Sequence, residues 1–233
     1  MITENNMYIA IDTSTETSSL ALARDDSILA ELTWHCRQNH TVQLLPALSN
    51  LLNQAGVSIG EAKGIIVARG PGSYNGLRVG LSTAKGLAIS LGIPLAGIST
   101  LEAEAYQCRE RNLPVCAVMN AGRGETATAI FESKGEGWTK IVAEHITSLE
   151  VLCTRINSPT VFCGEYVPAI MAELKNRLGD KALFISPARM LRRAGYLAEL
   201  GIQRLRAGDN DDPVTLQPLY LRAPPITQPR PRP

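Results

Sequence analysis

The order of apolar and polar positions divides the first part of the chain into strands followed by a helix. Three short apolar or alternating runs are separated by polar turns, which is typical of a strand meander. These runs are Met7–Ser14, Ser18–Arg24 and Ile28–Trp34. Beyond them the period lengthens, and apolar residues fall on one helical face from Thr41 to Ala55. Thr41 is the expected N-cap of this helix, and Gly56 is a natural stop.

The next segment alternates strands with helices. Gly64–Gly70 predicts a buried strand, and a helix is expected from about Ser73 to Leu91. Ile93–Ser99 predicts another strand, and the following helix opens with Ser99 and Glu102 in capping-box register. This alternation indicates an α/β fold with parallel pairing near the sheet centre.

The second half of the chain repeats the opening pattern. When "IAIDTSTETSSLAL" is set above "AVMNAGRGETATAI", Asp12 falls over Asn120. This match suggests two lobes of related topology. Later strands are expected at Thr160–Glu165 and Ala182–Ser186, with helices at Pro168–Leu178 and Ala188–Ala207.

These patterns divide the chain into three parts. Residues 1–105 are expected to form an N-terminal lobe, and residues 106–212 a C-terminal lobe. Residues 213–233 are expected to form a C-terminal segment with a proline-rich tail that is extended or disordered.

Composition and charge narrow the function classes. The 233 residues include 23 Lys plus Arg against 22 Asp plus Glu, a formal net charge of +1. A chain with so little excess positive charge is not expected to bind nucleic acid on its own, so any RNA substrate must be held mostly by a partner. The five cysteines form no CxxC pair, and we expect reduced thiols in a cytoplasmic protein. No signal peptide or membrane span is recognisable.

The segment "ARGPGSYNGLRVGLSTAKGLAISLG" could hold a phosphate or pack closely against a helix. It matches neither the Walker A pattern nor G-x-G-x-x-G. Gly76, Gly80, Ala84 and Ala88 are instead spaced four residues apart, so they form a stripe of small residues along one helix face. The stripe can pack on the chain's own sheet or on another chain, and spacing alone leaves both open.

Few other residues are candidates for a catalytic, metal-binding or phosphate-binding role. Asp12, Thr13 and Ser14 could orient a metal-bound phosphate, or they could simply close a hairpin turn. His35 and His40 are five residues apart across a strand-to-helix boundary, which is poor spacing for zinc. The three histidines support no Ser-His-Asp or Cys-His arrangement.

Four motifs carry a resemblance to a known family: "AIDTSTE", "RGPGSYNGLRVGLSTAKGLA", "PLAGISTLEA" and "LQPLYLRAPPIT". With them the sequence resembles the TsaB (YeaZ) family, a bacterial subunit needed to make threonylcarbamoyladenosine next to the tRNA anticodon. The resemblance runs from Tyr8 to about Thr227. It implies two actin-like or ribonuclease-H-like lobes, a duplicated ASKHA-type fold.

The resemblance also implies a non-catalytic subunit. The catalytic relative, TsaD, carries two metal-binding histidines where this chain has Thr100 and Glu104. Its glycine-rich adenosine motif is missing from "FCGEYV". We therefore expect no catalytic residue, metal or cofactor, and at most residual nucleotide binding at Asp12, Thr13 and Ser14. The expected partners are TsaD and the ATPase accessory subunit TsaE, with tRNA contacted only indirectly and no membrane.

Docking in this family is implied for the two helices at Thr41–Ala55 and Ser73–Leu91. The expected interface residues are Leu44, Leu48, Gly72, Tyr74, Gly76, Leu77, Gly80, Leu81, Ala84 and Ala88. Gly80→Leu is expected to block association and leave the monomer folded. The same face is expected to form a homodimer when the partner is absent. An independent actin-like ATP phosphotransferase and a metallopeptidase remain as alternatives.

Overall fold

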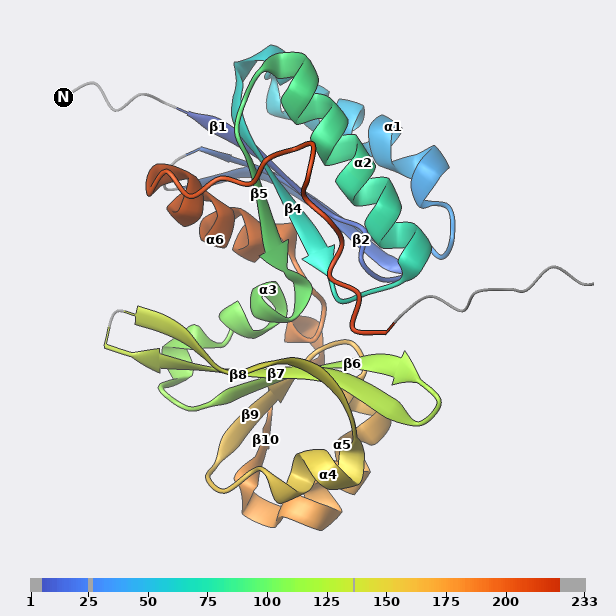
Figure 1. Ribbon diagram of the computed structural model, residues 1–233, viewed down its shortest axis with the longest axis vertical. Coiled ribbons are helices and arrows are strands. Elements are labelled where there is room, and N and C mark those ends of the chain that lie inside the picture. Colours follow the sequence, from blue (N-terminus) through green and yellow to red (C-terminus); the bar gives the residue numbers. More distant parts are fainter. Residues whose placement is uncertain (1–5, 25–26, 136, 223–233) are drawn as a thin grey trace, which may run out of the picture.

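Two five-stranded sheets form the two lobes of the computed structural model, which describes residues 6–24, 27–135 and 137–222 (Figure 1). The first lobe contains β1 (Met7–Asp12), β2 (Thr17–Arg24), β3 (Ser27–His35), α1 (His40–Ala55), β4 (Ala62–Gly70), α2 (Tyr74–Leu91) and β5 (Leu95–Ser99). The linking helix is α3 (Thr100–Tyr106). The second lobe contains β6 (Val115–Gly122), β7 (Glu125–Lys134), β8 (Gly137–Ser148), α4 (Leu149–Thr154), β9 (Thr160–Cys163), α5 (Val167–Leu178) and β10 (Ala182–Phe184). The last helix is α6 (Ala194–Arg206).

Both sheets have the same topology. The strand orders are β3-β2-β1-β4-β5 and β8-β7-β6-β9-β10, with antiparallel pairing in the first three strands and parallel pairing in the rest. This is the expected ribonuclease-H-like order, and the duplication is confirmed. The turns match as well. Asp12 Oδ1 accepts from Ser14 N at 2.9 Å, and Asn120 Oδ1 accepts from Gly122 N at 2.8 Å.

The first sheet is covered on both faces. α1 and α2 lie side by side on one face, where their apolar residues pack with Ile9, Leu20 and Val67 (Figure 1). α6 covers the other face and packs with Ala10 and Ile66. The expected assignment of α6 to the second lobe is therefore wrong. The chain crosses back to the first lobe before α6 begins.

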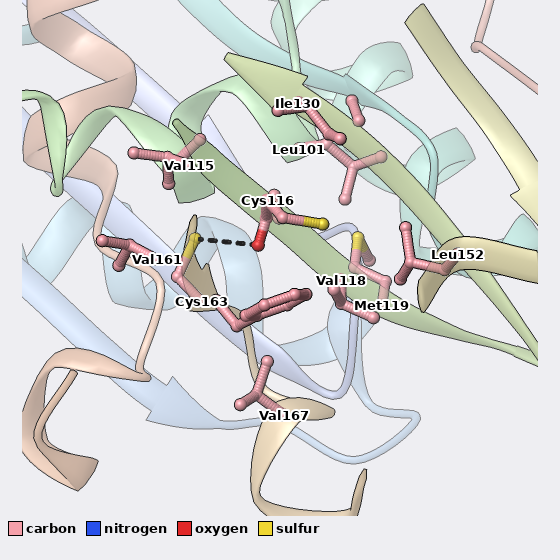
Figure 2. Packing of buried hydrophobic residues seen from close by; sticks show 14 of the residues in the cluster. Leu101, Val115, Cys116, Val118, Met119, Ile130, Leu152, Val161, Cys163 and Val167 are labelled. Carbon is pink, nitrogen blue, oxygen red and sulfur yellow. Dashed lines mark hydrogen bonds between the residues drawn. The ribbon is translucent and has the colours of Figure 1, made fainter. Parts of the chain in front are cut away.

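The second lobe has its own apolar core. Figure 2 shows Val115, Val118, Val161 and Val167 packed with Cys116 and Cys163, whose side chains are completely buried. All five cysteines are free thiols, and only Cys153 is more than marginally accessible. The four buried thiols, Cys36, Cys108, Cys116 and Cys163, serve as small core residues.

Two helix starts and one expected capping bond differ from the expectation. α1 begins at His40 after Asn39, not at Thr41, and Asn39 makes no side-chain capping bond. Ser99 precedes α3 but makes no capping bond either. α6 begins at Ala194 and not at Ala188, because only Pro187–Arg189 forms a short 3₁₀ turn and the chain then becomes irregular.

After α6 the chain returns across the first lobe toward the second. Leu216 is buried in the core beneath α2, and Leu219 N donates to Arg69 O at 2.7 Å. Arg222 then contacts the β6–β7 hairpin through Ala121 O at 3.2 Å and through Glu125. We call residues 209–222 the C-terminal strap. The expected disorder of the proline-rich tail concerns residues 223–233, which lie outside the described part of the chain.

Candidate functional site

Most of the expected interface residues lie inside the first lobe. Eight of them are buried: Leu44, Leu48, Gly76, Leu77, Gly80, Leu81, Ala84 and Ala88. Only Gly72 and Tyr74 are accessible. The expectation that these eight residues form a docking surface is wrong, because they are already covered by other parts of the first lobe.

The small-residue stripe has a specific intramolecular role. A side chain at Gly76 would collide with the backbone carbonyl of Thr13, and one at Gly80 would collide with the Thr13 hydroxyl. That hydroxyl donates to Gly76 O at 2.7 Å. The glycines therefore let α2 lie directly on the turn after β1, which offsets their poor helix propensity. It follows that Gly80→Leu would disrupt the monomer and cannot serve as a clean interface test.

The Asp12 turn lies in the interior. Asp12 is 1% exposed, and its Oδ1 accepts from both the backbone N (2.9 Å) and the hydroxyl (2.5 Å) of Ser14. Thr13 is committed to α2 as described above. The three candidate nucleotide-binding residues therefore have their polar groups bonded within the protein.

The other Asp12 oxygen pairs with an arginine that the sequence did not single out. Arg192 Nε donates to Asp12 Oδ2, and Arg192 Nη2 donates to the Thr15 hydroxyl at 2.9 Å. Arg192 Nη1 lies 3.3 Å from Glu165 Oε1 and 3.7 Å from Glu104 Oε2. The Thr15 hydroxyl in turn donates to Glu165 Oε2 at 3.0 Å. A single guanidinium thus holds carboxylates from both lobes.

Burial and charge act in opposite directions within this cluster. Complete burial raises the pKa of Glu104 to about 8, although the positive charge of Arg192 lowers it. Burial also opposes the charge of Arg192, but Asp12, Glu165 and Glu104 outweigh it and raise the pKa of the guanidinium. Arg192 is therefore a permanent cation, whereas Glu104 is protonated through neutral pH.

A cavity of about 940 Å³ opens beside this cluster, between the lobes. Its walls include Gly72 and Tyr74 from the first lobe and Met119 and Asn120 from the second. The strap closes one side, where the Tyr220 ring lies 5.1 Å from the Tyr74 ring, centroid to centroid. Sequence reasoning missed this wall because the strap joins it only after crossing the whole first lobe.

The histidines form no metal site. Within the described ranges, no group of three or more His, Cys, Asp or Glu side chains is arranged to hold a metal. His40 is buried, and its Nδ1 lies 3.0 Å from Ser18 Oγ and 3.2 Å from Cys36 Sγ. Burial lowers the pKa of His40, and this outweighs the opposing effect of Asp12. His35 is exposed beside Glu16.

The outward faces of α1 and α2 expose apolar residues that the sequence reasoning did not select. Val42 and Leu45 on α1 are 74% and 53% exposed, and Ile89 on α2 is 59% exposed. Gly86 lies on the same helix as Ile89, and an added side chain there would meet only open space. Gly86 has no packing reason inside the monomer, unlike Gly80. We call Val42, Leu45, Gly86 and Ile89 the outer helix face.

None of the helices in the described residues is long and apolar enough to cross a membrane.

Comparisons with known proteins identify close relatives. Residues 32–212 match the family model "TsaD: tRNA N6-adenosine threonylcarbamoyltransferase". The Bacillus subtilis "tRNA threonylcarbamoyladenosine biosynthesis protein TsaB" is 33% identical over 218 residues, which cover 92% of this chain and 93% of that protein. A "tRNA N6-adenosine threonylcarbamoyltransferase" from Pelobacter propionicus is 36% identical over 101 residues, 42% of this chain and 29% of that protein.

A solved structure shares the fold. A Pseudomonas aeruginosa protein described as similar to the peptidase YeaZ superposes with a TM-score of 0.79. It covers 93% of this chain and 100% of its own length at 23% identity. The likeness confirms the two-lobed α/β architecture.

Proposed function

Since the chain belongs to the TsaB family of tRNA threonylcarbamoyladenosine biosynthesis, we propose that it is a non-catalytic subunit that docks on a catalytic relative. That relative is a tRNA N6-adenosine threonylcarbamoyltransferase of the TsaD type, the enzyme named by the matching family model. The subunit acts as scaffold and activator, and an ATPase accessory subunit, TsaE, completes the complex.

The Asp12–Arg192 ion pair carries the non-catalytic part of the proposal. An Asp at the end of the first strand is useful to a phosphotransferase only if its oxygens can reach a bound metal or phosphate. Here both Asp12 oxygens are bonded within the protein, one to Ser14 and the other to Arg192. Freeing Asp12 would leave Arg192 without its nearest carboxylate in a buried position, which is strongly unfavourable.

The outer helix face carries the docking part. Exposed Val42, Leu45 and Ile89 present apolar side chains from two adjacent helices. A helix-interior glycine costs about 0.5–1 kcal/mol relative to alanine, and Gly86 gains nothing for it inside the monomer. A partner helix that approaches α2 closely at Gly86 would account for the missing side chain. The same face supports a two-fold homodimer when the partner is absent.

A charge argument supports indirect contact with tRNA. The net charge of +1 provides little of the counterion release that drives independent nucleic-acid binding. In this proposal the catalytic subunit supplies most of the tRNA surface.

Leu45→Asp tests the docking surface. A charge on this exposed face should abolish co-elution with the purified catalytic relative without lowering the melting temperature. Ile141→Asp, at an exposed apolar position on β8 of the other lobe, is the matched control and should leave co-elution unchanged. Co-elution that persists with Leu45→Asp would exclude this face as the docking surface.

The ATP phosphotransferase alternative is less well supported, because the Asp12 turn is bonded internally. Calorimetry with Mg-ATP tests it directly. Saturable heat from this protein alone at millimolar nucleotide would favour the alternative and count against a non-catalytic subunit.

A further inference from the structure

The C-terminal strap is the third member of the layer that covers one face of the first sheet. α1 packs against β2 and β3, and α2 packs mainly against β4. The strap takes the remaining edge strand, since Asp211 forms a bridge with Leu95 of β5 and its Oδ2 accepts from Gly97 N at 2.7 Å. Leu216 joins the same apolar core as the two helices. Because β4 lies between β5 and the strands that α1 covers, the order across the layer is α1, α2 and strap (Figure 1).

The strap is bonded to α2 at a tight turn. Lys85 Nζ donates to Val214 O and to Leu216 O, each at 3.1 Å. Asp212 closes the turn, because its Oδ1 accepts from Val214 N at 2.8 Å and its Oδ2 accepts from the Thr215 hydroxyl at 3.0 Å. The backbone on both sides of Val214 is therefore fixed, and the turn has little conformational freedom to lose when another surface packs on it.

The side chain of Val214 projects into solvent from this turn. It is 71% exposed, close to the 74% of Val42 on the outer helix face. Residues four apart in a helix are neighbours on its surface, so Ile89 lies one turn from Lys85, on the side of α2 that faces the strap. Val214 therefore adds an apolar side chain beside the outer helix face, on the flank of α2 away from α1.

We propose that the strap turn is part of the docking surface and that Val214 contacts the catalytic relative together with the outer helix face. The proposal rests on the docking function given above and enlarges its surface from two helices to three elements. The partner then presents an apolar face wide enough to cover α1, α2 and the strap. Since the turn is ordered before docking, burying Val214 adds affinity at a low cost in conformational entropy.

Val214→Asp in the full chain tests this contact. The new carboxylate would be buried against an apolar partner surface without a counter-charge. We expect at least about tenfold weaker binding to the purified catalytic relative in calorimetry. The melting temperature should not change, because the Val214 side chain is mostly exposed. Val151→Asp, at a valine that is 43% exposed on α4 of the second lobe, is the matched control and should bind like the parent.

Leu45→Asp, measured in parallel, separates this proposal from the docking function on which it rests. If Leu45→Asp loses binding while Val214→Asp binds like the parent, the strap has no part in docking, although the outer helix face does. If both variants bind like the parent, the docking surface is wrong and the role of Val214 is wrong with it.

A second copy of this chain is the other candidate occupant. Sedimentation of the parent and of Val214→Asp, each without the catalytic relative, measures self-association. A variant that self-associates more weakly than the parent, yet binds the catalytic relative equally well, would overturn the proposal and assign Val214 to a homodimer.

Discussion

The same substitution, glycine to alanine, is expected to have opposite effects on stability at two positions of α2. Gly80 and Gly86 both lie inside the helix, so alanine at either position gains about 0.5–1 kcal/mol of helix propensity. The surroundings then decide the sign. A methyl group at Gly86 meets open space, whereas one at Gly80 meets the Thr13 hydroxyl well inside van der Waals contact.

The magnitudes follow from these contacts. Gly86→Ala should keep the full gain, which corresponds to a rise in melting temperature of about 1–4 °C for a chain of this size. Gly80→Ala should displace Thr13 and weaken its 2.7 Å bond to Gly76 O. A lost hydrogen bond costs about 1 kcal/mol and overpacking about 1–3 kcal/mol, so the net result is a loss of about 1–3 kcal/mol.

Urea unfolding of the parent and both variants measures these differences, with unchanged slopes indicating that stability alone has changed. A Gly80→Ala protein as stable as the parent would refute the close packing of α2 on the β1 turn. A destabilised Gly86→Ala protein would refute the open surroundings of Gly86.

The association half of this prediction uses a larger side chain. Gly86→Leu should retain the gain in helix stability while it blocks a partner helix at the outer helix face. We expect at least tenfold weaker binding to the catalytic relative, about 1.4 kcal/mol. Unchanged affinity would mean that Gly86 lies outside the interface.

Three further predictions concern the interior. The pKa of Glu104 is raised from an ordinary 4.5 to about 8 in the folded protein. Between pH 4.5 and about pH 8 the chain therefore takes up a proton at Glu104 when it folds, so the free energy of unfolding falls as the pH rises through this range. Glu104→Gln removes this titration, so the melting temperature of the variant minus that of the parent should rise between about pH 6 and about pH 9. A difference that stays constant with pH would contradict the raised pKa of Glu104. Thr13→Val should lower the free energy of unfolding by about 1 kcal/mol in urea titrations, because the Gly76 carbonyl loses a donor, and no loss would show that the bond is unimportant. Leu216→Ala should cost about 2–5 kcal/mol and speed proteolysis of the strap, because Leu216 anchors it in the core beneath α2; unchanged cleavage would mean that the strap is held elsewhere.

Local periodicity predicted most of the fold because each element shows its own pattern. The first meander, the two helices ended by Gly56 and Gly92, and the repeated hairpin of the second lobe were all readable in this way. β8 was missed. It is an edge strand with mixed polar residues, so it shows no clear alternation. α4 has only six residues, which is too short for a helical period.

The candidate site was harder to predict from the sequence than the fold, because periodicity identifies one face of a helix without showing whether that face points to the core or to solvent. The small-residue stripe on α2 is real, but it faces the β1 turn and not solvent. The outward face was marked by a different glycine, Gly86, at a position that breaks the four-residue spacing. Sequence could not separate Arg192 from Arg193 either. The two are adjacent and identical, and only the crossing of the chain between the lobes buries the first and leaves the second half exposed.

Threonylcarbamoyl transfer to unmodified tRNA tests the central claim most directly. The assay compares this protein alone, the catalytic relative with its ATPase accessory subunit, and the complete mixture. A non-catalytic docking subunit predicts activity only in the complete mixture, saturating at one copy of this protein per catalytic subunit and lost with Leu45→Asp. Transfer by this protein alone would contradict the account, since it would require a working site at Asp12 despite its pairing with Arg192.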